Sequence, residues 1–175
     1  MKIAGFGGQG VLSMGVILAQ AANAASRNVS WYPSYGPEQR GGTSNCSVVI
    51  SGLPVGSPVV YNPDILVAMN RPSLERFAAD VKKGGTIIYD AVMGDVTIPD
   101  GVKGYAVPAS DLAKEAGSEK AANTVMLGVL MGLGITKLED AFYGAALEEN
   151  FSDKPKLIPM NKKALELGAA WAKKN

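Results

Sequence analysis

The residues best suited to chemistry form a glycine-rich stretch near the start of the chain, Gly5-Phe6-Gly7-Gly8-Gln9-Gly10. A short apolar run precedes this stretch and a long alanine-rich run follows it, which predicts a strand, a tight turn and a helix over residues 11–25. Glycines permit positive φ angles and the close approach of a ligand. The helix would point its unpaired N–H groups and the positive end of its dipole at the turn. The pattern therefore predicts a polar or anionic partner at Gly7, Gly8, Gln9 and Gly10.

Two other interpretations of this turn stay open. Gly5, Gly7 and Gly10 fit the dinucleotide fingerprint G-x-G-x-x-G, which would make the chain a stand-alone dinucleotide-binding oxidoreductase. That fingerprint requires an acidic residue about 20 positions later to hold the ribose, but the first carboxylate here is Glu38, beyond a proline. In the simplest interpretation, the glycines only let helix and strand pack closely, and Gln9 closes the turn onto its own backbone.

A second polar stretch, Ser34 to Gly42, fits neither a strand nor a helix period and is predicted to be a loop. Arg40 carries a fixed cation with five donors, flanked by glycines, so a carboxylate or phosphate could reach it. Glu38 is close enough in sequence to pair with Arg40 instead. We predict that both residues lie at a subunit contact or substrate channel. Tyr35 is expected to pack at a strand end or at an interface.

Composition narrows the function further. The 175 residues suit a single domain, 1–175, and the net charge of +1 makes nucleic acid and anionic membrane unlikely partners. The absence of histidine excludes a Ser-His-Asp or Cys-His mechanism, and one cysteine, Cys46, cannot hold an iron–sulfur cluster. No catalytic group and no metal site are therefore predicted. Without a signal-peptide pattern or a long apolar run, the chain is expected to be cytoplasmic.

The apolar pattern predicts an α/β fold, a Rossmann-like three-layer sandwich with a mixed, largely parallel sheet flanked by helices. The second strand is expected to stop at Pro33, and a helix opening at Pro72 is expected to run to residue 83. Asn70 follows a buried strand at the edge where ligands bind in open α/β sheets. The expected strands are 29–32, 43–51, 64–69, 86–90 and 103–107, and the later helices are 109–116, capped near Ser110 or Asp111, 123–133, 138–151 and 160–174.

With these residues laid out, the chain resembles the gamma subunit of the 2-oxoacid:ferredoxin (acceptor) oxidoreductases, and most of all the 2-oxoglutarate:acceptor type. The resemblance covers nearly the whole chain, and its most specific block is Gly-Pro-Glu-x-Arg-Gly-Gly. The residues that carry it are the glycine turn with Val11, the block from Tyr35 to Gly42 with Asn45-Cys46, Gly56-Ser57-Pro58, Asp64 to Pro72, and Asn123 to Gly128.

The resemblance implies a complex that decarboxylates a 2-oxoacid on thiamine diphosphate with Mg and passes electrons through iron–sulfur clusters to ferredoxin. The product is an acyl-coenzyme A, succinyl-coenzyme A where the oxoacid is 2-oxoglutarate. The expected partners are alpha, beta and delta-type subunits, which carry the cofactors, so this chain alone binds none and is not catalytic alone. Its expected role is assembly and access for substrate and coenzyme A. Pyruvate, branched-chain and indolepyruvate-specific members of the family are the alternatives.

Overall fold

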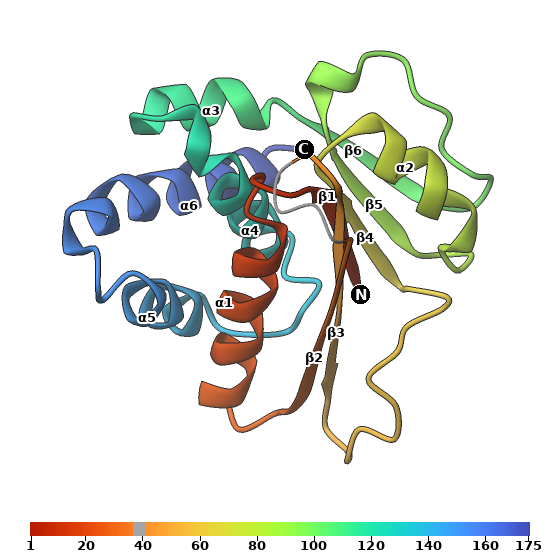
Figure 1. Cartoon of the computed structure of the whole chain (residues 1–175), viewed down its shortest axis with the longest axis horizontal. Coiled ribbons are helices and arrows are strands. Elements are labelled where there is room, and N and C mark those ends of the chain that lie inside the picture. The colour runs from red at the N-terminus through yellow and green to blue at the C-terminus, as the bar shows by residue number, and fades with distance from the viewer. Residues whose placement is uncertain (37–40) are drawn as a thin grey trace.

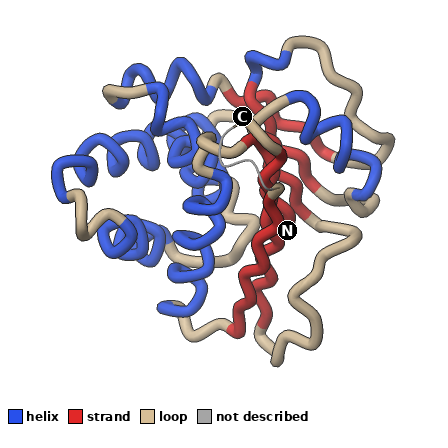
Figure 2. The backbone as a smooth tube through the Cα atoms, viewed as in Figure 1, coloured by secondary structure: helices blue, strands red, loops and turns tan. Residues whose placement is uncertain are grey.

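A six-stranded mixed sheet forms the middle of the protein in the computed structural model, which describes residues 1–36 and 41–175 (Figures 1 and 2). The strand order is β2-β3-β1-β4-β5-β6. Strands β1, β4, β5 and β6 are parallel, whereas β3 runs antiparallel to β1 and to β2. The α/β fold class is therefore confirmed. The strands are β1 (Lys2–Phe6), β2 (Asn28–Tyr35), β3 (Thr43–Ser51), β4 (Ile65–Ala68), β5 (Thr86–Asp90) and β6 (Lys103–Val107).

Helices cover the two faces of the sheet unequally. Figure 1 shows α1 and α4 on one side with α5 and α6 outside them, and the short α2 on the other side. The helices are α1 (Val11–Ala24), α2 (Arg71–Phe77), α3 (Ala109–Ala116), α4 (Ala122–Gly132), α5 (Asp140–Asn150) and α6 (Ile158–Ala172). Single 3₁₀ turns span Ala78–Asp80, Ala91–Met93, Glu119–Ala121 and Pro155–Leu157.

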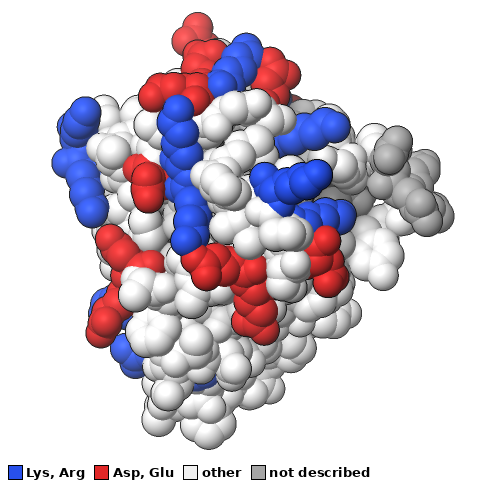
Figure 3. All heavy atoms as spheres, turned by 90° about the vertical axis from the view of Figure 1, so that its left-hand side faces the viewer, with Lys and Arg blue, Asp and Glu red and all other residues white. Residues whose placement is uncertain are grey.

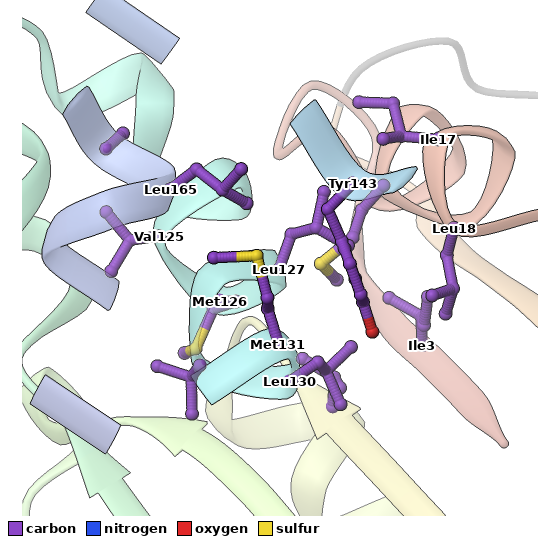
Figure 4. Packing of buried hydrophobic residues seen from close by; sticks show 14 of the residues in the cluster. Ile3, Ile17, Leu18, Val125, Met126, Leu127, Leu130, Met131, Tyr143 and Leu165 are labelled. Carbon is purple, nitrogen blue, oxygen red and sulfur yellow. The ribbon is translucent and has the colours of Figure 1, made fainter. Parts of the chain in front are cut away.

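The larger core lies between the sheet and the thick helical layer. Figure 4 shows Tyr143 of α5 with Ile17 and Leu18 of α1 on one side and Leu130 of α4 nearby, and all four side chains are buried. The hydroxyl of Tyr143 is hydrogen-bonded to Thr136, which satisfies its polar atom inside the core. A smaller core under α2 contains Ala4, Leu66, Ala68, Leu74, Ala78, Val81 and Ile87.

Three local expectations were wrong. β2 continues through Pro33 to Tyr35, because an edge strand tolerates a residue that lacks an N–H donor. The helix that begins at Arg71 ends at Phe77, and after one 3₁₀ turn Val81 adopts an extended conformation that buries its side chain in the smaller core.

The third difference concerns α3, which begins without a side-chain cap. The hydroxyl of Ser110 instead donates to Oδ2 of Asp90 at 3.0 Å, at the end of β5. A tertiary partner has therefore replaced the local cap that the sequence predicted.

Candidate functional site

The glycine stretch forms the turn between β1 and α1, as the sequence predicted. The N–H of Gln9 donates to the carbonyl of Phe6 at 3.1 Å, and the N–H of Gly7 donates to the carbonyl of Gly42 at 2.9 Å. Gly8 and Gly10 have φ angles of +98° and +73°, which a residue with a Cβ adopts only under strain. The turn therefore favours glycine at both positions.

Both amide atoms of the Gln9 side chain are hydrogen-bonded within the chain. Its Oε1 accepts from the backbone N–H of Phe6 at 2.7 Å and from Nδ2 of Asn70 at 2.8 Å. Its Nε2 donates to the carbonyl of Met69 at 2.9 Å. The side chain of Gln9 thus ties the end of β1 to the end of β4, and the interpretation in which Gln9 closes the turn is confirmed. A ligand contact of its amide stays a prediction.

The position of the Gln9 side chain argues against dinucleotide binding at this turn. β1 and β4 are adjacent, and the helices that follow them leave to opposite faces of the sheet, α1 to one and α2 to the other (Figure 1). A crevice at such a switch point is where open α/β sheets bind nucleotides. Here the Gln9 and Asn70 side chains cross the crevice, and β2 ends in Tyr35 where the ribose-binding acid would be needed. The structure therefore disfavours the stand-alone dinucleotide-binding oxidoreductase.

The open side of the turn faces a cleft of about 670 Å³. It lies beside the first turn of α1, which has no side-chain cap and no acidic residue in its first turn. The positive end of this helix is thus compensated by no carboxylate of its own, a setting that favours an anion. The described residues that line the cleft are Phe6, Gly7, Gly8, Gly10, Val11, Leu12, Ser13, Tyr35, Gly36, Thr43 and Ser44.

The sequence did not predict that Asn123 supports the glycine turn. Nδ2 of Asn123, at the start of α4, donates to the carbonyl of Gly10 at 3.3 Å, and its side chain fills the space that a Cβ at position 10 would need. The pair is separated by 113 positions, so no local pattern connects them. Its only trace in the sequence is a polar residue at the start of an otherwise apolar, methionine-rich helix.

Comparison with known proteins now assigns the family. The family description "Pyruvate ferredoxin/flavodoxin oxidoreductase" matches residues 1–171. The chain belongs to this family.

Relatives refine the picture. The ketoisovalerate oxidoreductase subunit VorA of Methanothermobacter marburgensis is 57% identical over all 175 residues, and the chain spans 37% of that protein's length. The 2-oxoglutarate synthase subunit KorC of Methanothermobacter thermautotrophicus is 41% identical over 138 residues, which cover 74% of this chain and 73% of that one.

Solved structures agree in fold. The keto/oxoacid ferredoxin oxidoreductase gamma subunit of Geobacter sulfurreducens is 30% identical with a TM-score of 0.83, and the match covers 99% of this chain and 98% of that chain. The 2-oxoglutarate:ferredoxin oxidoreductase of Magnetococcus marinus, solved with 2-oxoglutarate, coenzyme A and succinyl-CoA bound, is 29% identical with a TM-score of 0.88 over 99% of this chain and 31% of that one. The resemblance to gamma subunits is confirmed.

The structure brings together only part of the set of site residues predicted from the sequence. Tyr35 lies at the cleft with the glycines, and 69% of its surface is exposed. Asn70 lies behind the turn, where its Oδ1 accepts from the N–H of Ser73 at 2.9 Å and caps α2. Arg40 and Glu38 fall outside the described residues, so their predicted place at a subunit contact or channel stays a prediction.

Cys46 is fully buried on β3, as expected of a structural thiol. Burial raises the pKa of Cys46 to about 11, so the reactive thiolate is scarce at neutral pH. Among residues 1–36 and 41–175, no group of His, Cys, Asp or Glu is arranged to hold a metal ion. No helix in this described part is long and apolar enough to cross a membrane.

Proposed function

We propose that this chain is the gamma-type part of a 2-oxoacid:ferredoxin oxidoreductase whose substrate is a branched-chain 2-oxoacid of the ketoisovalerate kind. The observation that carries the substrate class is the 57% and 55% identity to two ketoisovalerate oxidoreductase subunits over the full 175 residues. Identity to the KorC subunit falls to 41% and spans 138 residues. 2-Oxoglutarate, the first expectation from the sequence, is therefore the second candidate.

The side chains of this chain do not fit the cofactors of such an enzyme. Thiamine diphosphate with Mg needs oxygen ligands gathered around the metal, and an iron–sulfur cluster needs several thiolates. The chain has one cysteine, which is buried, and the described residues contain no metal-ligand group. In this proposal the cofactors and the alpha, beta and delta-type partners supply the chemistry and the electron path to ferredoxin, and this chain supplies assembly and access.

The cleft at the glycine turn is the proposed point of access. The exposed backbone at Gly8, together with the uncompensated first turn of α1, suits an anionic group such as a coenzyme A phosphate. The hydroxyls of Ser13, Thr43 and Ser44, whose residues line the same cleft, are further polar groups for such a ligand. Arg40, two residues before Gly42, stays a predicted contributor of positive charge.

Activity of the assembled enzyme tests the substrate class. The complex would be purified through a tag on this chain, and coenzyme A-dependent ferredoxin reduction would be measured with ketoisovalerate, 2-oxoglutarate, pyruvate and indolepyruvate. We expect the highest kcat/KM for ketoisovalerate. A higher kcat/KM for 2-oxoglutarate would overturn the substrate assignment, and a chain that purifies alone with a bound nucleotide would overturn the family role.

A pair of glycine variants tests the anion contact. A Cβ at Gly8 would point into open space at the turn, and a Cβ at Gly84, whose φ is +79°, meets an equally open environment away from the cleft. We expect Gly8→Ala to raise the KM for coenzyme A with little change in the KM for the oxoacid, whereas Gly84→Ala leaves both unchanged. Reduced assembly of Gly8→Ala with an unchanged KM would place a partner chain at the turn instead.

A further inference from the structure

The face formed by α1 and β2 has hollows but no charges. Besides the cleft at the glycine turn, a second hollow of about 210 Å³ lies farther along α1, lined by Val16, Ala19, Gln20, Asn23 and Trp31. Leu12 and Ser13 line the first cleft, and Val16 is one helical turn beyond Leu12. The two hollows therefore follow one another along α1, and we refer to the second one as the α1–β2 groove.

The groove belongs to a part of the sequence that is almost free of charge. Between Ile3 and Pro63 the only charged residues are Arg27, Glu38 and Arg40, whereas 29 of the 33 charged residues of the chain lie from Asp64 onward. Charge is also unevenly spread over the surface: in Figure 3, Lys, Arg, Asp and Glu gather over the upper and middle parts of the face shown, and its lowest part is largely uncharged. Depletion of charge together with exposed aromatic side chains is typical of the centre of a protein interface.

One polar atom in the groove has no partner among the described residues. Oε1 of Gln20 is shielded from solvent, although the residue itself is only partly buried. A shielded amide carbonyl without a donor is costly. Because Gln20 as a whole is partly exposed, a rotation of its side chain that turns Oε1 outward would let this atom accept from an N–H or O–H group of a docked partner. This atom distinguishes the groove from an ordinary apolar surface, because it is a hydrogen-bond acceptor at a defined position that lacks a donor.

The longer relatives contain a polypeptide portion that is large enough to cover the groove. The match spans 37% of the ketoisovalerate oxidoreductase subunit and 31% of the Magnetococcus oxidoreductase chain, so in both proteins most of the polypeptide lies beyond the part that corresponds to this chain. In this chain Val16 of the groove lies one helical turn from Leu12, which lines the cleft at the glycine turn. A body seated in the groove would therefore lie beside the cleft.

We propose that the α1–β2 groove is the docking surface for the rest of the oxidoreductase, which places an uncharged apolar segment along Val16 and Ala19 with a hydrogen-bond donor opposite Oε1 of Gln20. This inference rests on the proposed function, because it requires that the rest of the oxidoreductase exists as a partner. It goes beyond that function in naming the face that docks and the chemistry of the segment that meets it.

Hydrogen–deuterium exchange locates the docking face. The complex purified through a tag on this chain is compared with the isolated full chain, and we expect added protection in α1 and β2 and no added protection in the β5–β6 region. If no oxidoreductase subunits co-purify, the proposed function fails. If they co-purify while protection appears only outside α1 and β2, the proposed function stands and the groove assignment is overturned.

Point variants test the chemistry of the groove. Ala19→Lys places a charge against the docked segment, and we expect the dissociation constant of the complex, measured by mass photometry over a dilution series, to rise at least about tenfold. Val92→Lys is the matched control, because Val92 is 77% exposed and lies between β5 and β6. Equal effects of the two variants would overturn the proposal, as would an isolated chain that forms a dimer sensitive to Ala19→Lys while partner binding is unaffected.

Gln20→Leu separates docking from folding. It removes the unpartnered carbonyl while keeping a similar shape, so the melting temperature of the isolated chain should hold or rise, whereas the dissociation constant of the complex should rise about fivefold. A purely structural glutamine would instead lower the melting temperature and leave the complex unchanged. That outcome would overturn the role assigned to Gln20.

Discussion

The two edges of the sheet are built differently. β6 has five residues, begins with Lys103, and holds the Lys103 ammonium 4.7 Å from the centre of the Tyr105 ring. β2 has eight residues, none of them charged, and exposes Trp31, Tyr32 and Tyr35. Short, lysine-bearing edges are a common protection against unwanted strand pairing. β6 thus has the features of an edge that faces water, and β2 has those of an edge that is covered.

Ion pairs follow the same division. The salt bridges of the described residues all join side chains between Asp64 and Lys173, among them Lys82 with Asp64 at 2.8 Å and Lys114 with Glu119 at 3.2 Å. Such exposed pairs contribute roughly 0–1 kcal/mol each. Their main effect here is on solubility, and none of these pairs includes a residue of α1 or β2. The difference teaches that α1 and β2 lack the charged surface that the later elements present to solvent, as expected if they form a contact surface.

The largest effect is expected at the glycine turn on the β2 side. Gly10→Ala should lower the free energy of unfolding by about 2–5 kcal/mol, because the left-handed φ costs about 1–2 kcal/mol and the new Cβ would overlap Asn123. Gly84→Ala near β5 has a similar φ but open surroundings, so it should cost only about 1–2 kcal/mol. Urea denaturation of both variants measures the difference. Equal losses would show that Asn123 moves aside and does not lock the turn.

A second, pH-dependent effect is expected at Cys46, which packs between α1 and β2. Burial raises the pKa of this thiol from 9.0 to about 11 in the folded chain, so its thiolate fraction near pH 8 should be about 100-fold lower than in the unfolded chain. Because the folded pKa is raised, the stabilisation is complete below pH 9 and is lost as the pH rises from 9 toward 11. The loss is at most on the order of 2–3 kcal/mol.

Thiol titration and melting curves check this prediction. A disulfide reagent at pH 8 should modify Cys46 rapidly only in denaturant. The melting temperature of the unmodified chain should fall between pH 9 and 11, and it should fall less in Cys46→Ala, which lacks the thiol. Tyr143 is a second contributor at the upper end of this range, since burial raises its pKa to about 12, and it is unchanged in the variant. Rapid modification of the folded chain at pH 8 would show that β2 opens away from α1.

Much of the fold could be predicted from local patterns. The strand 43–51 and the strand 86–90 have the predicted bounds, and α1 differs from its predicted range by one residue. These elements were visible because β-branched runs and turn residues specify them over short distances. Pro33 misled the prediction for β2, because its effect depends on whether a strand lies at the edge of the sheet, and strand order is a property of the whole chain.

The candidate site was predictable only in outline. The glycine turn and Tyr35 line one cleft, but no pattern in the sequence connects them. Gln9 was a candidate ligand contact, but its amide is used between β1 and β4, and Asn70 joins it there. These contacts connect residues about 60 positions apart, and the sequence alone does not show which polar groups satisfy one another across strands.

The smallest effect on stability is expected from replacing one residue in each edge strand, the proline of β2 or the lysine that begins β6. These replacements are also the most direct test of the two edges. Pro33→Val restores an N–H donor within the uncharged β2 edge, and Lys103→Val removes the charge from the β6 edge. Each should change the free energy of unfolding by no more than about 1 kcal/mol. Self-association of the isolated chain, measured by analytical ultracentrifugation, should increase more for Pro33→Val, because an eight-residue edge without charges offers a longer template for pairing than a five-residue one. Stronger association of Lys103→Val would reverse the comparison and show that the charge on β6, rather than the proline in β2, is what keeps the chain from pairing.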